Sequence, residues 1–427
     1  MIKKVLIYSL LLITAIDSET LVFPPYGHSY GIRKAKPAHL FMLLGPRTFF
    51  DDPQGLATTR LEAWEDTTTK KDDDEVVVYG VNSGRHQIIY NTSMWTLGLY
   101  GEKGEGIDQF CNPKGVAADP KGNVYVADSG NNRVVHLFNP GKELRWEKSF
   151  NGKFSTDKGL KGPSRISLDQ SGNVYVTDPG NSRIIVFTKD GELLRKIPSA
   201  NDYSFEKGPT ALVVADGASR WSHFKKEHVI FCADLNGTRL WKIDLKGNVI
   251  KRTILPEKYQ ASYAATDYYH NIWLTDTYNH CVLKYDHNLQ LLDIFGSYGT
   301  GDNQFVEPRG IAIYQRFGQV FIAEKKGAQY YWIGTDLKSY ELSRQRPGKY
   351  DLTVNATEFS FVTLFSVSGN DTSFLLKKRM ILPGGYRIPV FQAGPEIITQ
   401  KQLKLKIEPT YSSYTYNAWF FPVSVKE

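Results

Sequence analysis

Short apolar runs that end in an acidic or turn residue recur along most of the chain. The two clearest copies are Gly122–Val134, with the sequence GNVYVADSGNNRV, and Gly172–Ile184, with the sequence GNVYVTDPGNSRI. Their acids, Asp128 and Asp178, are 50 residues apart, and the spacing between other successive copies ranges from 42 to 56 residues. Weaker copies share the apolar run and its acid, at Phe231–Asp234, Trp273–Asp276 and Phe321–Glu324, and a first copy at Val77–Gly80 lacks the acid. A unit of about 48 residues therefore repeats along the chain.

Each unit divides into several short strands. In the unit around Asp128, residues 115–118 form a strand of small residues, and residues 123–127 are apolar on both alternating faces, as in a strand covered on both sides. The β-branched and aromatic runs, with turn residues between them, exclude a helical solenoid. Units of this length with several short strands are typical of propeller blades. We predict an all-β fold with a six-bladed β-propeller over residues 39–338.

The ends of the repeat region predict how the ring of blades closes. The pattern aromatic-x-x-Pro-x-Gly precedes three units, at Phe50–Gly55, Phe110–Gly115 and Phe305–Gly310. Residues 39–44 come before the first of these and fill the place of a fourth strand, whereas residues 309–337 supply three strands and no clear fourth. Pairing residues 39–44 with the last unit would remove two exposed sheet edges. We therefore expect this N-terminal strand to close the propeller.

The two clearest units resemble the NHL repeat, whose hallmark is the pattern G-N-x-Y-V-A-D-x-x-N-x-R-I/V. The match is strong at Gly122–Val134 and Gly172–Ile184 and partial in the other units, over residues 39–337. The resemblance implies a six-bladed propeller. It implies no particular activity, because propellers of this kind serve many functions.

The N-terminus predicts export. Met1–Lys4 is a short basic start, and residues 5–16 are almost wholly apolar, a length that suits a signal-peptide core and is too short for a membrane span. We expect a signal peptide over residues 1–18, an N-terminal segment over residues 19–38, and a secreted or periplasmic protein without a membrane span. An uncleaved N-terminal anchor is the alternative.

The repeat pattern stops after Leu337. Residues 344–348 have the composition of a linker, and residues 348–427 contain strand-like runs separated by turns. This length suits a small sandwich, so we predict a C-terminal β-sandwich-like domain over residues 348–427. The alternative is a segment that wraps around the propeller instead of folding alone.

Composition narrows the range of partners. The 427 residues carry a formal net charge of +7 that is not concentrated in one block, which permits an anionic partner without demanding one. We predict no nucleic-acid partner, because the charge is modest and export separates the protein from RNA. Four N-x-S/T sites are potential glycosylation sites if the protein is secreted by a eukaryote, at Asn91, Asn236, Asn355 and Asn370.

The three cysteines form no C-x-x-C pair, which argues against a zinc knuckle. Cys232 and Cys281 lie in apolar runs, so we interpret both as small buried hydrophobic residues. One disulfide is compatible with export, and the sequence leaves the pairing among Cys111, Cys232 and Cys281 open.

The acids that end the apolar runs form a ring on one face of the predicted propeller. A metal or catalytic role is conceivable, but an Asp followed by Gly, Asn or Ser also satisfies the backbone N–H groups of a tight turn. The acids recur in nearly every unit, and arginines five residues later are placed to pair with them, so we favour a structural role. The residues assigned this role are Asp128, Arg133, Asp178, Arg183, Asp234, Arg239, Asp276 and Glu324.

Residues that do not repeat, at the mouth of the propeller axis, are better candidates for a binding site. The innermost strand of each unit begins there, and three of its first positions are cationic, with no carboxylate and no histidine among them. Converging cations between low-dielectric walls favour an anionic ligand or an acidic peptide. Neutralisation by water and by acids of neighbouring loops is the alternative. The candidate ligand-binding residues are Gln54, Lys114, Arg165, Thr210, Tyr263 and Arg309.

The same positions test two families of propeller enzymes. Peptide-amidating lyases of this fold carry metal-binding histidines at these positions, in the motif Pro-His-Gly. This chain has Gln54, Lys114 and Arg309 in place of those histidines. Gluconolactonase-like propellers use an axial glutamate, which none of these positions supplies. The nine histidines do not converge, and the G-x-S-x-G, P-loop and Rossmann motifs are absent. We assign no catalytic residue, metal ligand or cofactor. We predict a secreted binding or scaffold protein that recognises a protein, peptide or anionic ligand, with a metal-dependent propeller enzyme as the alternative.

Overall fold

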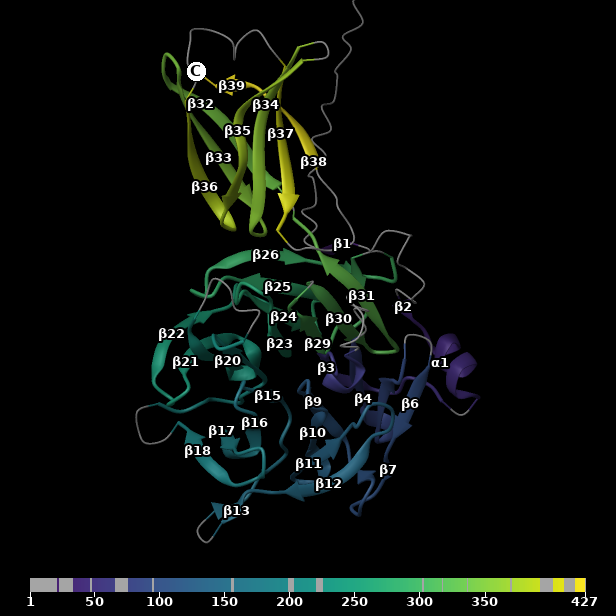
Figure 1. The fold of residues 1–427 in the computed structure, drawn as a ribbon. Coiled ribbons are helices and arrows are strands. Elements are labelled where there is room, and N and C mark those ends of the chain that lie inside the picture. The colour runs from purple at the N-terminus through teal and green to yellow at the C-terminus, as the bar shows by residue number, and fades with distance from the viewer. Residues whose placement is uncertain are drawn as a thin grey trace, which may run out of the picture. The chain divides into compact units, whose positions relative to one another are not determined.

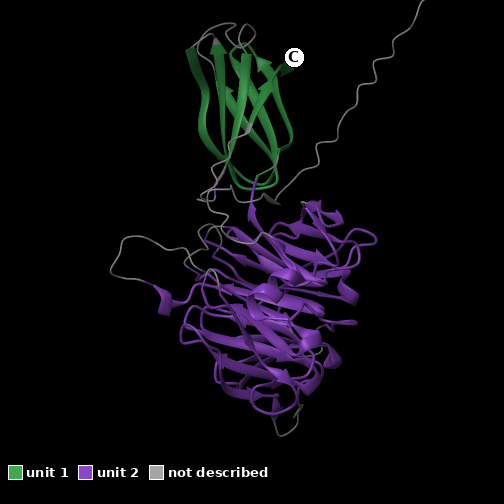
Figure 2. Cartoon of the chain, turned by 90° about the vertical axis from the view of Figure 1, so that its right-hand side faces the viewer, with its two compact units in different colours: residues 1–20, 335–408, 419–427 green, residues 21–334, 409–418 purple. Residues whose placement is uncertain are grey.

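The structure is a computed structural model that describes residues 21–22, 34–46, 48–65, 76–93, 96–154, 157–198, 203–219, 226–301, 303–316, 318–335, 337–368, 371–391, 402–410 and 419–426. The chain divides into two compact units (Figure 2), the larger with residues 21–334 and 409–418 and the smaller with residues 1–20, 335–408 and 419–427. The predicted signal peptide and Asn370 lie outside the described residues. None of the helices in the described ranges has the length and apolar character needed to cross a membrane.

The larger unit is built mainly from antiparallel sheets in which strands that follow one another in the chain pair (Figure 1). Six such sheets occur among its described residues; the innermost strand of each contacts that of the next, and the last contacts the first. The strands are, sheet by sheet, β3 (Pro53–Thr59), β4 (Val77–Asn82), β5 (Gln87–Asn91) and β6 (Leu97–Tyr100); β9 (Pro113–Ala118), β10 (Asn123–Asp128), β11 (Arg133–Phe138) and β12 (Arg145–Phe150); β15 (Ile166–Leu168), β16 (Val174–Asp178), β17 (Arg183–Phe187) and β18 (Leu193–Ile197); β19 (Ala211–Asp216), β20 (His228–Asp234), β21 (Arg239–Asp244) and β22 (Val249–Ile254); β23 (Tyr263–Thr266), β24 (Ile272–Asp276), β25 (Cys281–Tyr285) and β26 (Leu291–Phe295); and β29 (Ile311–Tyr314), β30 (Gln319–Glu324) and β31 (Gly327–Ile333). The prediction of an all-β propeller is confirmed, and we call these sheets blades.

The second strand of a blade lies between two neighbouring blades, which explains why it is apolar on both faces. In β10, Val124 and Val126 pack with the first blade, including Tyr79. On the opposite face, Tyr125 packs with the third blade, including Val176. All five side chains are buried. Burial on both faces removes the alternation of apolar and polar residues that a half-exposed strand would show.

The last blade completes its sheet with residues from the N-terminus. The outer edge of β31 pairs with β1 (Leu21–Val22) at Trp332 and Ile333 and with β2 (Lys34–Ala35) at Ala328 and Gln329. Two short N-terminal strands thus take the place of a fourth strand and cover the edge that β31 would otherwise expose.

Residues 39–44 do not form this strand, so that prediction is wrong. They belong to α1 (Pro37–Leu44), the one α-helix of the described residues, which contacts β6. Pro37 is the first helical residue, where its fixed φ suits the helix and its missing N–H group leaves no hydrogen bond unmade. The following leucines and methionine are strong helix formers. A run of five apolar residues, Leu40 to Leu44, carries too little periodicity to distinguish a strand from a helix.

Shorter elements lie in the connections between these strands. The two-residue strands are β7 (Glu102–Lys103), β8 (Gln109–Phe110), β13 (Lys153–Phe154), β14 (Asp157–Lys158), β27 (Ser297–Tyr298) and β28 (Gln304–Phe305). The 3-10 helices are η1 (Glu62–Trp64), η2 (Ser83–Arg85), η3 (Ser129–Asn131), η4 (Pro179–Asn181) and η5 (Leu235–Gly237). The last four directly follow the second strand of their blades and form the turn into the third.

The smaller unit consists of two four-stranded sheets that enclose one apolar core. One sheet has the order β36-β33-β32-β39 and the other β35-β34-β37-β38. The core includes Leu352 and Val354 from the first sheet and Leu364 and Leu405 from the second. The strands are β32 (Leu337–Arg346), β33 (Lys349–Ala356), β34 (Ser360–Ser368), β35 (Asp371–Ile381), β36 (Gly384–Phe391), β37 (Gln402–Pro409), β38 (Trp419–Val423) and β39 (Val425–Lys426). This is the arrangement of a β-sandwich.

The interpretation of residues 344–348 as a linker is wrong. They form the end of β32 and the turn into β33, with Arg344 paired to Tyr350. The segment looks like a linker because residues 344–346 are polar and exposed and because Pro347, which is exposed, and Gly348, with a φ of 75°, form a turn. The boundary between the compact units lies before it, at Gly334 and Thr335.

Candidate functional site

The innermost strands approach each other backbone to backbone around the axis. A Cβ atom on Gly310 would lie 2.2 Å from the Gln54 carbonyl oxygen, and one on Gly115 would lie 2.6 Å from the Ser164 carbonyl oxygen. The Gly310 N–H donates to the same Gln54 oxygen at 3.0 Å. Only glycine permits this approach, so the glycine of the Pro-x-Gly pattern brings the residue before it, such as Lys114, to the ring of innermost strands.

Arg165 and Tyr263 take the positions where other blades have these glycines. Tyr263 lies opposite Thr275, one residue before the acid Asp276, as Gly115 lies opposite Ala127. The Arg165 guanidinium lies over the Tyr263 ring, with 3.5 Å between its Cζ and the ring centroid. Two large side chains from the third and fifth blades therefore stack where four other blades carry only glycine or alanine.

This stack is fixed by neighbouring polar groups. Arg165 Nε donates to the Ser262 carbonyl oxygen at 3.0 Å, and the Tyr263 hydroxyl donates to Gln54 Oε1. Thr210 donates to the Ala261 carbonyl oxygen at 3.1 Å. The side chains of Gln54, Arg165 and Tyr263, predicted as separate contributors to one site, are thus in direct contact.

Arg309 belongs to the same cluster and has acidic partners. It forms ion pairs with Asp52 and, at 3.2 Å, with Glu307, which also binds Lys325 at 2.6 Å. Thr275 Oγ1 donates to the Arg309 carbonyl oxygen at 2.7 Å and holds its backbone. The sequence reasoning missed Asp52, because it considered the first strand positions alone; the signal was an acid immediately before the Pro-x-Gly pattern.

Lys114 is the cation of the cluster without a partner. Among the described residues its ammonium forms no hydrogen bond or ion pair, and burial, followed by the positive charge of Arg165, lowers its pKa. Burial also lowers the pKa of Arg165, and the charge of Arg309 adds to this. Burial raises the pKa of Tyr263 despite the opposing effect of both arginines. An anion placed here would relieve the repulsion between the cations and would meet fixed donors.

The acids at the ends of the second strands bind the backbone of the preceding connection. Asp128 Oδ1 accepts the Cys111 N–H at 2.7 Å, while its Oδ2 accepts Arg133 Nε at 2.8 Å and Asn131 Nδ2 at 2.7 Å. Asp178 binds Lys161 N–H, Arg183 and Asn181 in the same way. Asp234 binds Glu206 N–H and Arg239, and Asp276 binds Gln260 N–H and Asn279.

The first blade uses an amide at this position. Asn82 Oδ1 accepts the Asp51 N–H at 2.7 Å, as the aspartates accept theirs. The first apolar run therefore ends at Asn82. The sequence pattern had placed its end, and the missing acid, two residues earlier at Gly80. The shift arose because asparagine performs the same capping without matching the acidic pattern.

Glu324 gives the last blade a pH dependence that we expect to be measurable. Burial raises its pKa from 4.5 to about 7, against the opposing hydrogen bonds from Gln329 and Val306 N–H. The folded protein then holds a proton that the unfolded chain releases, so the free energy of unfolding falls as pH rises from 4.5 to about 7. Glu324→Gln should remove this loss and raise stability at pH above about 7 by on the order of 1–3 kcal/mol.

Urea unfolding of both proteins on either side of that pH window measures the effect. The matched control is Glu143→Gln, which changes an exposed carboxylate in the second blade and should keep the wild-type pH profile. A Glu324→Gln variant that loses stability with rising pH as steeply as the wild type would contradict the prediction.

The described residues contain no group of three or more His, Cys, Asp and Glu side chains placed to hold a metal ion. All three cysteines are free thiols. Cys232 and Cys281 are buried, as predicted, and burial raises the pKa of Cys281 to about 12.

Comparisons with known proteins agree with the fold. The NHL repeat family model matches residues 110–137 and 160–187. The chain is thus a β-propeller protein that carries NHL repeats. Comparison with curated proteins gives no match.

Solved structures with a similar fold include three bacterial proteins. Virginiamycin B lyase from Staphylococcus aureus is 16% identical, with a TM-score of 0.42 over 60% of this chain and 77% of that chain. A gluconolactonase from Xanthomonas campestris is 13% identical, with a TM-score of 0.47 over 70% of this chain and 93% of that chain. Regucalcin, a calcium-binding protein from Agrobacterium tumefaciens, is 9% identical, with a TM-score of 0.44 over 67% of this chain and 92% of that chain. Likeness at this level says nothing about the activity of this chain.

Proposed function

We propose that the protein is an exported recognition protein that binds an anionic ligand, such as an acidic peptide, at the mouth of the propeller axis. The observation that carries the proposal is the cluster of Lys114, Arg165 and Arg309, in which Arg165 stacks on Tyr263 and Lys114 lies close enough to Arg165 to feel its charge. Export is proposed from the apolar run at residues 5–16.

The two acidic side chains of the cluster pair with only one of its three cations. Asp52 and Glu307 both bind Arg309, and neither binds Lys114 or Arg165. Arg165 uses its Nε on a backbone carbonyl and its face on Tyr263. A carboxylate is therefore expected to bind between Lys114 and Arg165, where a planar guanidinium and an ammonium supply several donors.

Lys114→Glu tests this site. We expect the variant to bind a tri-glutamate peptide at least about tenfold more weakly than the wild type, because it replaces attraction by repulsion in a partly buried site. The wild-type affinity should fall with added salt. Calorimetric titration measures both effects. Lys121→Glu is the matched control, because Lys121 is an exposed lysine just beyond the other end of β9.

Equal binding by the wild type and Lys114→Glu would reject the mouth as the site. Metal analysis of the same preparation tests the enzyme alternative. Stoichiometric Ca²⁺ or Zn²⁺ in the purified protein, together with no binding of the acidic peptide, would favour that alternative over recognition.

A further inference from the structure

The outer strand of the fourth blade exposes aliphatic side chains to an unusual degree. In β22, Val249, Ile250 and Ile254 are 40%, 54% and 62% exposed. The equivalent β12 of the second blade exposes Arg145 and other polar residues while its aromatic side chains turn inward. Both strands end their sheets, since neither pairs with another strand of the described chain on its outer side. Charged residues on such an edge discourage pairing with foreign strands. Those of β22, Lys251 and Arg252, are both cationic and so discourage basic chains more than acidic ones.

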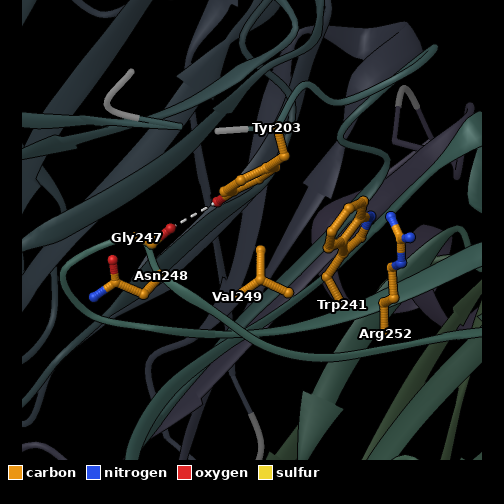
Figure 3. Close-up of a pocket in the computed structure, with 6 residues that line it drawn as sticks. All are labelled: Tyr203, Trp241, Gly247, Asn248, Val249 and Arg252. Carbon is orange, nitrogen blue, oxygen red and sulfur yellow. Dashed lines mark hydrogen bonds between the residues drawn. The ribbon is translucent and has the colours of Figure 1, made fainter. Parts of the chain in front are cut away.

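A pocket of about 420 Å³ opens beside this edge (Figure 3). Its aromatic wall is Tyr203 stacked on Trp241, with ring centroids 5.3 Å apart. The Tyr203 hydroxyl donates to the Gly247 carbonyl oxygen at 3.0 Å, which ties the connection before β19 to the turn before β22. Val249 and Arg252 of β22 complete the lining together with Asn248.

A register shift in β22 explains why Val249 and Arg252, three residues apart, reach the same pocket. Arg252 pairs with Trp241, and Val249 pairs with Ile243, so Ile250 is the extra residue of a β-bulge. Trp241 and Ile243 are two residues apart and share one face of the sheet, and their partners therefore share it too. The bulge leaves residues 251–254 in regular register beside the pocket.

The edge is also cationic. Arg252 lies over the Trp241 ring, with 5.5 Å between its Cζ and the ring centroid, and its guanidinium forms no ion pair within the described ranges. Lys251 precedes it and is exposed. An incoming chain with carboxylates opposite these two residues would gain cross-strand pairs, whereas a basic chain would be repelled.

We propose that β22 is a docking strand for an extended acidic peptide segment of a partner protein. The segment pairs along residues 251–254, places an apolar or aromatic side chain in the pocket beside Tyr203 and Val249, and sets carboxylates against Lys251 and Arg252. Main-chain hydrogen bonds supply affinity in such strand addition, and pockets for alternate side chains supply specificity. This surface lies on the outer strand of one blade and shares no residue with the proposed mouth site.

The probe is a fluorescein-labelled peptide of valines and one tyrosine with two adjacent glutamates, because Lys251 and Arg252 are consecutive and lie on opposite faces of the sheet. We expect it to bind the full-length protein, and expect Arg252→Glu and Val249→Glu each to weaken binding at least about tenfold, because each places a carboxylate in the pocket lining against an acidic peptide. A peptide of the same sequence with alternate N-methylated amides should not bind at β22, because it cannot pair with a strand edge. All these measurements use the Lys114→Glu protein, so that binding of acidic peptides at the proposed mouth site does not contribute. The comparison of the two peptides uses one and the same protein and so does not depend on the folding of a β22 variant.

Two exposed positions on other outer strands supply the controls. Arg145→Glu on β12 and Leu291→Glu on β26 repeat the same charge changes, and binding should stay within about twofold of the protein with unaltered outer strands. Equal binding of the N-methylated peptide, or equal effects of the β22 and control substitutions, would overturn the proposal. Binding of an acidic oligosaccharide without binding of the peptide would overturn it as well, because the site would then recognise a sugar acid.

Discussion

Gly310→Ala should destabilise the propeller by about 3 kcal/mol or more, although it adds one methyl group. The new Cβ would lie 2.2 Å from the Gln54 carbonyl oxygen, 2.7 Å from Leu56 N and 2.8 Å from Gly55 C. All three atoms are backbone atoms of the first innermost strand, which is paired with β4 and cannot turn aside as a side chain can. The substitution forces the last and first blades apart at the axis. It also breaks the hydrogen bond from the Gly310 N–H to the Gln54 carbonyl oxygen.

Gly80→Ala is the matched control within the same unit. Its Cβ would meet Leu56 Cδ2 at 3.2 Å, the far end of a flexible side chain, so we expect a loss below about 1 kcal/mol. The urea midpoint, followed by tryptophan fluorescence, measures both variants. Similar midpoints for the two alanine variants would mean that the innermost strands do not need glycine at the axis.

The fold was readable from the sequence where the same physical demand repeats. Each second strand is covered on both sides, so its apolar run recurs, and the acid after it recurs because each turn has a backbone N–H to satisfy. The closing segment could not be read in this way. Residues 34–35 form two residues of strand with no apolar pattern, while the apolar run at 39–44 forms a helix. Pairing with β31 is a tertiary contact that leaves little local signal.

The candidate site was predicted in part for a related reason. Counting back from the repeated acids places Lys114, Arg165 and Arg309 near one another, because the repeat fixes their register. The sequence does not show that Arg165 stacks on Tyr263, because the two residues belong to different blades. Arg165 and its hydrogen-bond partner Ser262, next to Tyr263, are 97 residues apart in the chain. Nor does it tell that Asp52 binds Arg309, which depends on the first and last blades meeting.

The largest effect that we expect from a polar substitution is at Asp234. Asp234→Ala should cost about 3–5 kcal/mol, because it removes one partner of a buried ion pair. Its side chain is 0% exposed. Its carboxylate accepts from Arg239 Nη2 at 2.6 Å, from Trp241 Nε1 at 2.7 Å and from Glu206 N–H at 2.8 Å. Alanine would leave all three donors without this acceptor.

Glu206→Ala provides the comparison, because it removes the other carboxylate that binds Arg239. Glu206 is 57% exposed and pairs with Arg239 at 3.1 Å, so its loss should cost no more than about 1 kcal/mol.

The two urea midpoints, measured without added metal, also distinguish a structural role from a ligand-binding role for the ring of acids. A carboxylate kept for a ligand is a repulsive, poorly satisfied group in the free protein, and its removal tends to leave stability unchanged or raise it. A carboxylate that holds a turn behaves in the opposite way. A stable Asp234→Ala variant would therefore return the acids to the list of functional candidates, whereas the expected loss assigns them to the structure of the blades.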